Sequence, residues 1–129
     1  MKRYPLDILT HPCIATFPLD SEKVVKLSLE YGFAMEVNNT NLRVGKTNIE
    51  QLIGMIHLAK EQGAVLVENS DGHSYFEIGE NDRIEELLHE LKLNGNDLFM
   101  NRDDDALNNF LDKRKRIREH NTRKSRTSI

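Results

Sequence analysis

Short runs of apolar residues alternate along the chain with longer stretches in which apolar residues recur every three or four positions. Runs of the first kind predict buried strands, and stretches of the second kind predict amphipathic helices. The predicted strands span residues 6–11, 33–39, 64–69 and, on a weaker pattern, 97–100. The predicted helices span residues 20–31, 47–63 and 82–92, and a last one begins near residues 103–105.

Residues typical of helix ends flank these stretches. Thr47 and Glu50 form a T-x-x-E pattern, which predicts a capping box at the start of the second helix. Gly32 and Gly63 follow the last apolar positions of the first two helices, where glycine commonly ends a helix. The residues typical of helix ends therefore lie where the apolar periodicity predicts that the helices begin and end.

Alternation of strand and helix predicts βα units around a parallel sheet, and hence an α/β fold. Four such units can form a small open sheet or about half of an eight-unit barrel. Both arrangements are a single domain, which we expect over residues 1–112. A half-barrel would expose two strand edges, which invites association with another chain.

Charge is unevenly distributed. The net charge is −3, yet residues 113–129 carry eight Lys and Arg against one Glu. We interpret this segment as the basic end of the last helix followed by a disordered tail. Contact of the tail with nucleic acid or another acidic surface is the alternative. The acidity of residues 1–112 is not typical of a nucleic-acid-binding domain.

Composition predicts a cytoplasmic protein. No apolar run approaches the length of a membrane span, and the N-terminal residues lack the pattern of a signal peptide. Cys13 is the single cysteine, which excludes a disulfide within the chain. Because no dedicated base or second cysteine accompanies Cys13, we interpret it as a small packing residue.

Polar residues gather where the predicted strands end. His11 ends the first strand, Glu36 and Asn38 share one face at the end of the second, and Asp71 and His73 follow the third. Carboxyl ends of parallel strands meet at one edge of a sheet, where ligands bind. Histidine and aspartate are plausible ligands for zinc, manganese or iron.

Each of these residues also has a simpler interpretation. His11 precedes a proline and would serve as a capped loop residue, Asp71 and Gly72 form an ordinary turn pattern, and Glu36 could pair with a basic side chain. The remaining histidines lie on predicted helices away from the strand ends, and we expect them at the surface: His57, His89 and His120.

Three motifs in this order resemble the C-terminal part of the polymerase and histidinol phosphatase (PHP) family, and most of all its small phosphatase-like members. They are LTHP at 9–12, AMEVNNT at 34–40 and ENSDGH at 68–73. The resemblance covers about residues 4–112. It implies a distorted TIM-like β/α barrel with a cluster of metal ions, often zinc or manganese, at the carboxyl ends of the strands.

Carried over motif by motif, the resemblance makes His11, Asp71 and His73 metal ligands. It makes Glu36, Asn38 and Asn39 second-shell residues or residues lining the substrate mouth. It singles out no catalytic residue beyond these. The H-x-H strand with which the family pattern begins has no counterpart in this sequence, so we expect about half of a barrel.

The resemblance therefore predicts a metal-dependent phosphoesterase that acts on a small phosphate ester and could be incomplete without an N-terminal half. The alternative is a non-catalytic half-barrel, from a truncated or split gene, that self-associates or pairs with another chain. We expect no membrane partner, and nucleic acid only through the basic tail.

Overall fold

A three-stranded parallel sheet organises the chain. The computed structural model describes residues 5–127. The strands lie in the order β1-β2-β3 and are β1 (Ile8–Leu9), β2 (Ala34–Asn38) and β3 (Leu66–Asn69). Ile8 pairs with Ala34 in β2, and Met35 pairs with Leu66 in β3. The parallel α/β class is confirmed, and the half-barrel stays a prediction.

Helices connect the strands and continue after β3. They are α1 (Ser21–Tyr31), α2 (Asn39–Arg43), α3 (Ile49–Gln62), α4 (Asp82–Leu91), α5 (Gly95–Leu98) and α6 (Asp104–Thr127). Two short 3-10 helices are η1 (Tyr75–Glu77) and η2 (Met100–Arg102). Within the described residues, no helix is both long and apolar enough to cross a bilayer.

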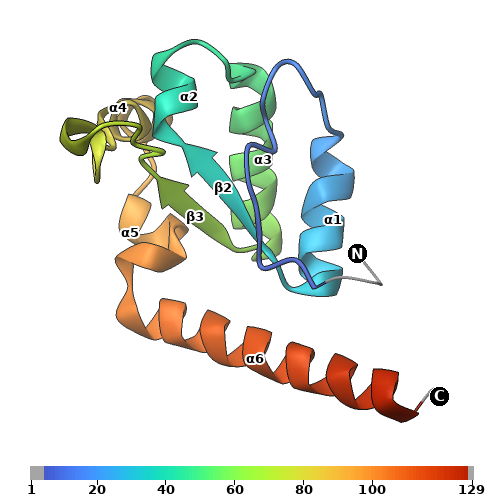
Figure 1. The fold of residues 1–129 in the computed structure, drawn as a ribbon. Coiled ribbons are helices and arrows are strands. Elements are labelled where there is room, and N and C mark those ends of the chain that lie inside the picture. Colours follow the sequence, from blue (N-terminus) through green and yellow to red (C-terminus); the bar gives the residue numbers. More distant parts are fainter. Residues whose placement is uncertain (1–4, 128–129) are drawn as a thin grey trace.

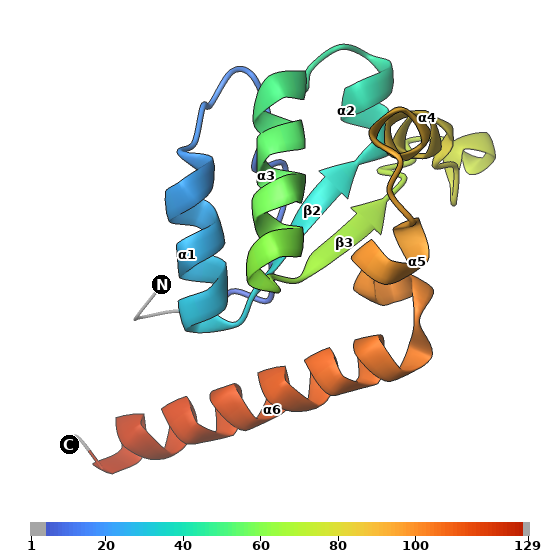
Figure 2. The ribbon, with the colours of Figure 1, turned by 180° about the vertical axis from the view of Figure 1, so that it is seen from behind.

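Helices α1 and α3 cover one face of the sheet (Figures 1 and 2). Side chains alternate along β2, so Met35 and Val37 join α1 and α3 in the main apolar core. Ala34 points to the opposite face, where it packs with Val67 of β3 and Phe110 of α6. Glu36 and Asn38 follow Ala34 on that second face, toward the carboxyl end of the strand.

The first two long helices end as the sequence predicts. Gly32 and Gly63 adopt left-handed conformations, with φ of 71° and 73°, and their N–H groups bond back into the last turn. The predicted start of α3 is displaced by one residue, because Asn48 rather than Thr47 is its N-cap. The Asn48 side chain accepts a hydrogen bond from the backbone N–H of Gln51.

The fourth predicted strand, 97–100, is wrong. Asn94 caps the short helix α5 instead, and Phe99 makes a single parallel bridge to Leu66. Asn101 then bonds the edge of β3 with its side chain, accepting from the Glu68 N–H at 3.1 Å and donating to the Glu68 carbonyl at 3.0 Å. The amide thus takes the place that a neighbouring strand would occupy.

Helix α6 crosses the N-terminal ends of the strands (Figure 1). Its buried Arg114 donates to Asp7 at 2.9 Å and to the carbonyls of Tyr31 and Leu6 at 2.7 and 2.6 Å. Arg118 also pairs with Asp7. The basic end is helical through Thr127, where a disordered tail was predicted, and residues 128–129 lie outside the described part of the chain.

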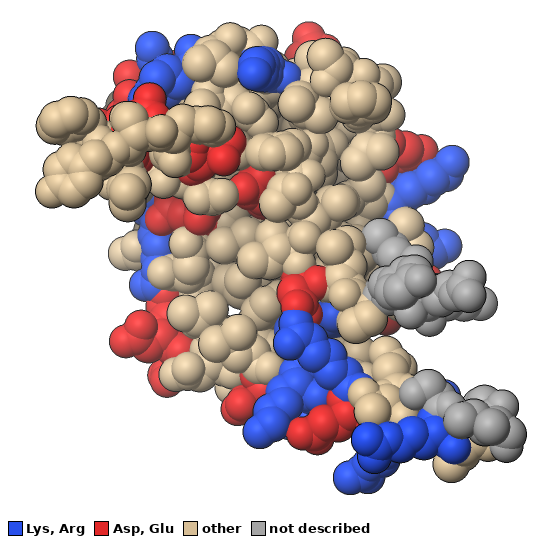
Figure 3. Space-filling model, in the orientation of Figure 1, with Lys and Arg blue, Asp and Glu red and all other residues tan. Residues whose placement is uncertain are grey.

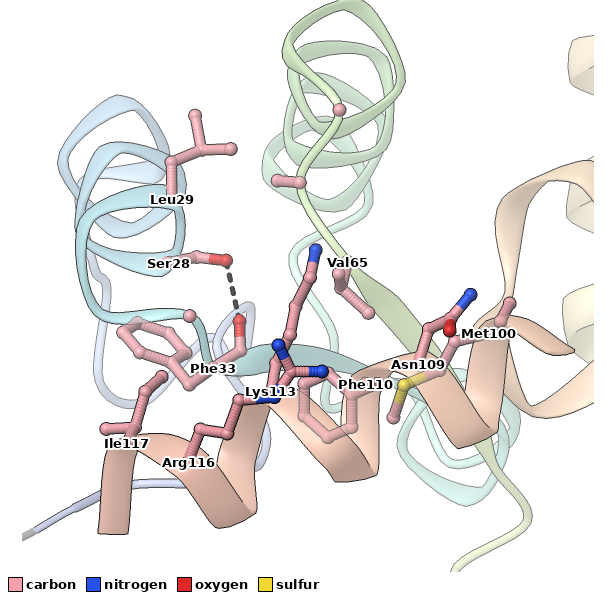
Figure 4. Close-up of a pocket in the computed structure, with 14 residues that line it drawn as sticks. Ser28, Leu29, Phe33, Val65, Met100, Asn109, Phe110, Lys113, Arg116 and Ile117 are labelled. Carbon is pink, nitrogen blue, oxygen red and sulfur yellow. Dashed lines mark hydrogen bonds between the residues drawn. The ribbon is translucent and has the colours of Figure 1, made fainter. Parts of the chain in front are cut away.

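Lys and Arg gather along α6, with acidic residues beside them, as the lower part of Figure 3 shows. A hollow of about 490 Å³ lies between α6 and the ends of α1 and α3, lined largely by apolar side chains such as Phe33, Val65 and Phe110 (Figure 4). It lies at the N-terminal ends of the strands, opposite the predicted metal ligands.

Candidate functional site

His11 lies two residues after β1 and is hydrogen-bonded to Glu36 of the neighbouring strand β2. Its backbone N–H donates to Glu36 Oε2 at 2.8 Å, and its ring Nδ1 lies 3.2 Å from the same oxygen. Nδ1 also lies 3.1 Å from Asn38 Nδ2 and 2.9 Å from Asn41 Nδ2. All three ring contacts use Nδ1, so Nε2 has no partner among the described residues.

Glu36 is the centre of this network. It is 3% exposed, and Asn69 at the end of β3 donates to its Oε1 at 2.6 Å. Asn38 Nδ2 lies 3.4 Å from its Oε2. Burial of a carboxylate is costly unless hydrogen bonds compensate, and donors from three neighbouring strand ends supply them here. The structure therefore brings together His11, Glu36 and Asn38 as predicted, and adds Asn41 and Asn69.

Asn39 has a different place from the one predicted. It is fully buried, and its Oδ1 accepts from the backbone N–H groups of Arg83 and Ile84 at 3.0 and 3.1 Å. Its Nδ2 donates to Asp82 Oδ1 at 2.9 Å. Asn39 thus satisfies the first turn of α4, rather than facing the mouth.

The contacts of Asn39 also favour the charged form of Asp82. The amide of Asn39, followed by the guanidinium of Arg43, lowers the pKa of Asp82 to about 2. Arg43 bonds Asp82 at 3.0 Å and Glu80 at 2.7 Å. These contacts tie α2 to the start of α4 and so fix the C-terminal end of the loop that carries the third motif.

Asp71 and His73 lie on that loop, which projects from the carboxyl end of β3 (Figure 1). His73 Nδ1 lies 2.7 Å from the backbone oxygen of Asp71. A carbonyl oxygen only accepts, so Nδ1 carries the proton and a neutral His73 ring keeps a lone pair on Nε2. His73 is exposed, and Asp71 is half-buried.

The backbone is strained at two of the proposed ligands. His11, after β1, and Asp71, on the loop after β3, both have positive φ, of 52° and 50°, a costly backbone conformation for residues other than glycine and one that is often found at functional sites. Gly72 has no room for a side chain, because a Cβ would lie 2.9 Å from the backbone of Glu77 and Ile78. Hydrogen bonds from the backbone N–H of His73, and then of Ser74, lower the pKa of Glu77 below its usual value.

The predicted metal ligands fit the chemistry of a metal site one by one. A ligand histidine usually donates from one ring nitrogen to a carboxylate or carbonyl and binds the metal with the other. His73 has this arrangement through the Asp71 carbonyl. His11 can adopt it through Glu36 only when Nδ1 is protonated, because the amide Nδ2 atoms of Asn38 and Asn41 otherwise make Nδ1 an acceptor and leave the proton on Nε2. Within residues 5–127, however, no three His, Cys, Asp or Glu side chains converge closely enough to hold a metal ion.

The other candidates of the sequence are at the positions expected of them. Cys13 is buried, contacts Met55 Sδ at 3.7 Å, and has its pKa raised to about 12 by burial, so it is a packing residue rather than a thiolate. His57, His89 and His120 are exposed on helices α3, α4 and α6. Sequence patterns gave no role to Asn41, which directly follows the motif at 34–40, or to Asn69, which lies inside the motif at 68–73.

Comparison with known proteins finds relatives along most of the chain. The chain is 36% identical over 115 residues to a protein of Shewanella sp. strain ANA-3 named probable phosphatase. The aligned part makes up 88% of this chain and 45% of the relative. The chain is 34% identical over 119 residues to a probable phosphatase of Acetivibrio thermocellus, covering 92% and 49%. A further probable phosphatase, from Caldanaerobacter subterraneus, is 32% identical over 114 residues.

No family model matches the chain. The chain spans about half the length of the curated relatives it matches. The matched part is long enough to include the strand ends described above. The chain is therefore similar, along 88% of its length, to about half of a protein named a probable phosphatase.

Proposed function

We propose that this chain contributes part of the active site of a metal-dependent phosphoesterase of the PHP type. The observation that carries the proposal is a pair of histidines beyond the carboxyl ends of β1 and β3, His11 and His73. Their Nδ1 atoms are engaged, and their Nε2 atoms have no partner among the described residues. The names of the relatives support phosphate-ester chemistry. His11, Asp71 and His73 are the proposed ligands, with zinc or manganese the metals we favour and iron a third.

Each residue would have a defined role. Glu36 orients the His11 ring and, if Nδ1 is protonated, makes Nε2 a stronger donor. Asn38 and Asn69 hold the Glu36 carboxylate in place. The Asp71 carbonyl keeps the proton of His73 on Nδ1. A bound metal would supply an activated water and would neutralise the charge of the phosphate ester.

The remaining ligands would come from a second half of the barrel, on the same polypeptide or on another. Two observations support this. The relatives are about twice as long as the part that this chain matches. The two edges of the sheet also differ, because Asn101 occupies the β3 edge, whereas Ile8 in β1 is 39% exposed at the other edge. A strand of the second half would pair beside β1.

A complementation assay tests the proposal. Hydrolysis of p-nitrophenyl phosphate is measured with the zinc- or manganese-loaded chain, alone and mixed with the unmatched half of the Acetivibrio thermocellus relative. We expect activity in the mixture that falls by about 100-fold with Asp71→Ala and His73→Ala together. A triple variant of the exposed His57, His89 and His120 is the matched control.

Two outcomes would reject the proposal. Activity that the Asp71 and His73 substitutions leave unchanged would place the chemistry elsewhere. No activity in the mixture, although the two halves bind each other, would favour the non-catalytic half-barrel.

A further inference from the structure

Three large apolar side chains stand in solvent directly after His73. Tyr75 is 84% exposed, Phe76 is 82% exposed and Ile78 is 72% exposed. We call these three residues the apolar platform. Single exposed apolar residues are common, but a group of them on one short loop marks a binding surface.

The loop beneath the platform is held by many contacts. Glu77 Oε2 accepts from the backbone N–H of His73 at 2.8 Å and of Ser74 at 3.0 Å. Ser70 joins the two ends of the loop, because its Oγ accepts from the Gly79 N–H at 3.2 Å and its carbonyl accepts from Thr40 at 2.8 Å. The exposed side chains are therefore carried on a constrained backbone.

The platform also has internal geometry. The rings of Tyr75 and Phe76 meet edge to face, with centroids 5.6 Å apart and an angle of 81° between their planes. This is a favourable arrangement of two aromatic rings. The pair forms an apolar surface that begins two residues after His73 on a constrained backbone, so little backbone ordering is needed when a ligand binds.

We propose that the apolar platform binds the organic group of the phosphate ester, and that it selects esters whose organic group is an aromatic ring. This inference rests on the proposed function, since it places the phosphate at His73 and its neighbours. The platform itself is unsuited to the phosphate. Its three side chains carry no charge, and the nearby guanidinium of Arg43 is already paired with Glu77 at 3.9 Å and with Glu80 at 2.7 Å.

The phosphate group and the aromatic group of such a substrate would contact different parts of the site. Phosphate oxygens need donors or a metal, which the strand ends would supply. An aromatic leaving group needs apolar surface and ring contacts, which Tyr75 and Phe76 supply. The platform would thus affect the choice among esters far more than the affinity for phosphate.

Calorimetry on the full chain, loaded with zinc, tests this separation without turnover. The probes are phenyl phosphate and methyl phosphate, which carry the same anionic group. We expect phenyl phosphate to bind about fivefold to tenfold more tightly. The double substitution Tyr75→Ala and Phe76→Ala should abolish this preference while methyl phosphate affinity stays unchanged. Phe17→Ala is the matched control, because Phe17 is 73% exposed elsewhere on the surface.

The calorimetry distinguishes a failure of the apolar platform from a failure of the proposed phosphate site. A preference for phenyl phosphate that survives the double substitution would overturn the platform. If neither ester binds, this chain holds no phosphate without the second half, and the platform is then judged with phenol by saturation-transfer NMR. Transfer to phenol that disappears in the double variant would sustain the platform, and no transfer in the wild-type chain would overturn it.

Discussion

The two histidines of the candidate site present the same ring nitrogen but are supported in opposite ways. His11 is held by side chains from the sheet, chiefly the buried carboxylate of Glu36. His73 is held by its own loop, through the Asp71 carbonyl and a backbone contact to Glu77. The position of His11 therefore depends on the stability of the fold, whereas that of His73 depends on the integrity of one turn.

The largest predicted effect is on the side of His11. Glu36→Ala would leave the His11 N–H without its acceptor, would remove one acceptor from the amide of Asn38, and would open a cavity where a buried side chain stood. We expect a loss of about 3 kcal/mol in the free energy of unfolding, since an unsatisfied buried donor costs about 1 to 3 kcal/mol and the cavity adds to it. Urea denaturation measures it.

The control for Glu36 is Glu90→Ala, which removes an exposed carboxylate on α4. If both variants unfold at the same urea concentration as the wild-type chain, Glu36 does not have the central role assigned to it.

The second prediction concerns the turn of His73. Gly72→Ala would place a Cβ against the backbone of Glu77 and Ile78, which cannot yield as a side chain can. We expect a loss of about 2 kcal/mol from this overpacking. Hydrogen exchange should locate the faster amides in the loop between β3 and α4, with the rest of the sheet little changed.

Gly54→Ala is the matched control for this substitution. Gly54 lies inside α3, and a Cβ there would meet no atom within 4 Å. Alanine should stabilise the helix by about 0.5 to 1 kcal/mol. Equal effects of the two substitutions would mean that the turn does not require glycine.

The smallest prediction concerns pH. Folding lowers the pKa of Asp82 from 3.8 to about 2, so its carboxylate stabilises the fold fully above the higher value. This contribution is lost as the pH falls through the window between those two values. The difference in Tm between the wild-type chain and Asp82→Asn should therefore be constant at neutral pH and shrink toward pH 2.

Asp112→Asn, an exposed carboxylate on α6, serves for comparison. A difference in Tm for Asp82→Asn that stays the same down to pH 2 would show that its bonds to Asn39 and Arg43 do not link α2 and α4.

Sequence patterns predicted much of the fold because its signals are local. Apolar periodicity and glycine located α1, α3 and α4 to within one or two residues, and the three strand ends fell where the apolar runs stop. The prediction of a strand at 97–100 was wrong for a local reason. Phe99 is buried as a strand residue would be, but Asn94 caps the helical turn that precedes it. Side-chain capping competes with strand formation, and an apolar run does not reveal it.

The site was predictable in part for a similar reason. Alternation along β2 placed Glu36 and Asn38 on one face, as predicted. It could not foresee that Asn39 would turn toward α4, because that depends on where a helix more than forty residues later begins. Nor could it reveal Asn41 and Asn69, whose contacts with His11 and Glu36 exist only once the chain is folded.

Zinc binding measured by calorimetry tests most directly whether the Nε2 atoms of His11 and His73 bind a metal ion. The full chain should bind about one zinc per chain, more weakly as the pH falls and histidine becomes protonated. The His11→Ala and His73→Ala double variant should lose this binding, while the triple variant of His57, His89 and His120 keeps it. Equal zinc affinity in the double and triple variants would contradict the assignment.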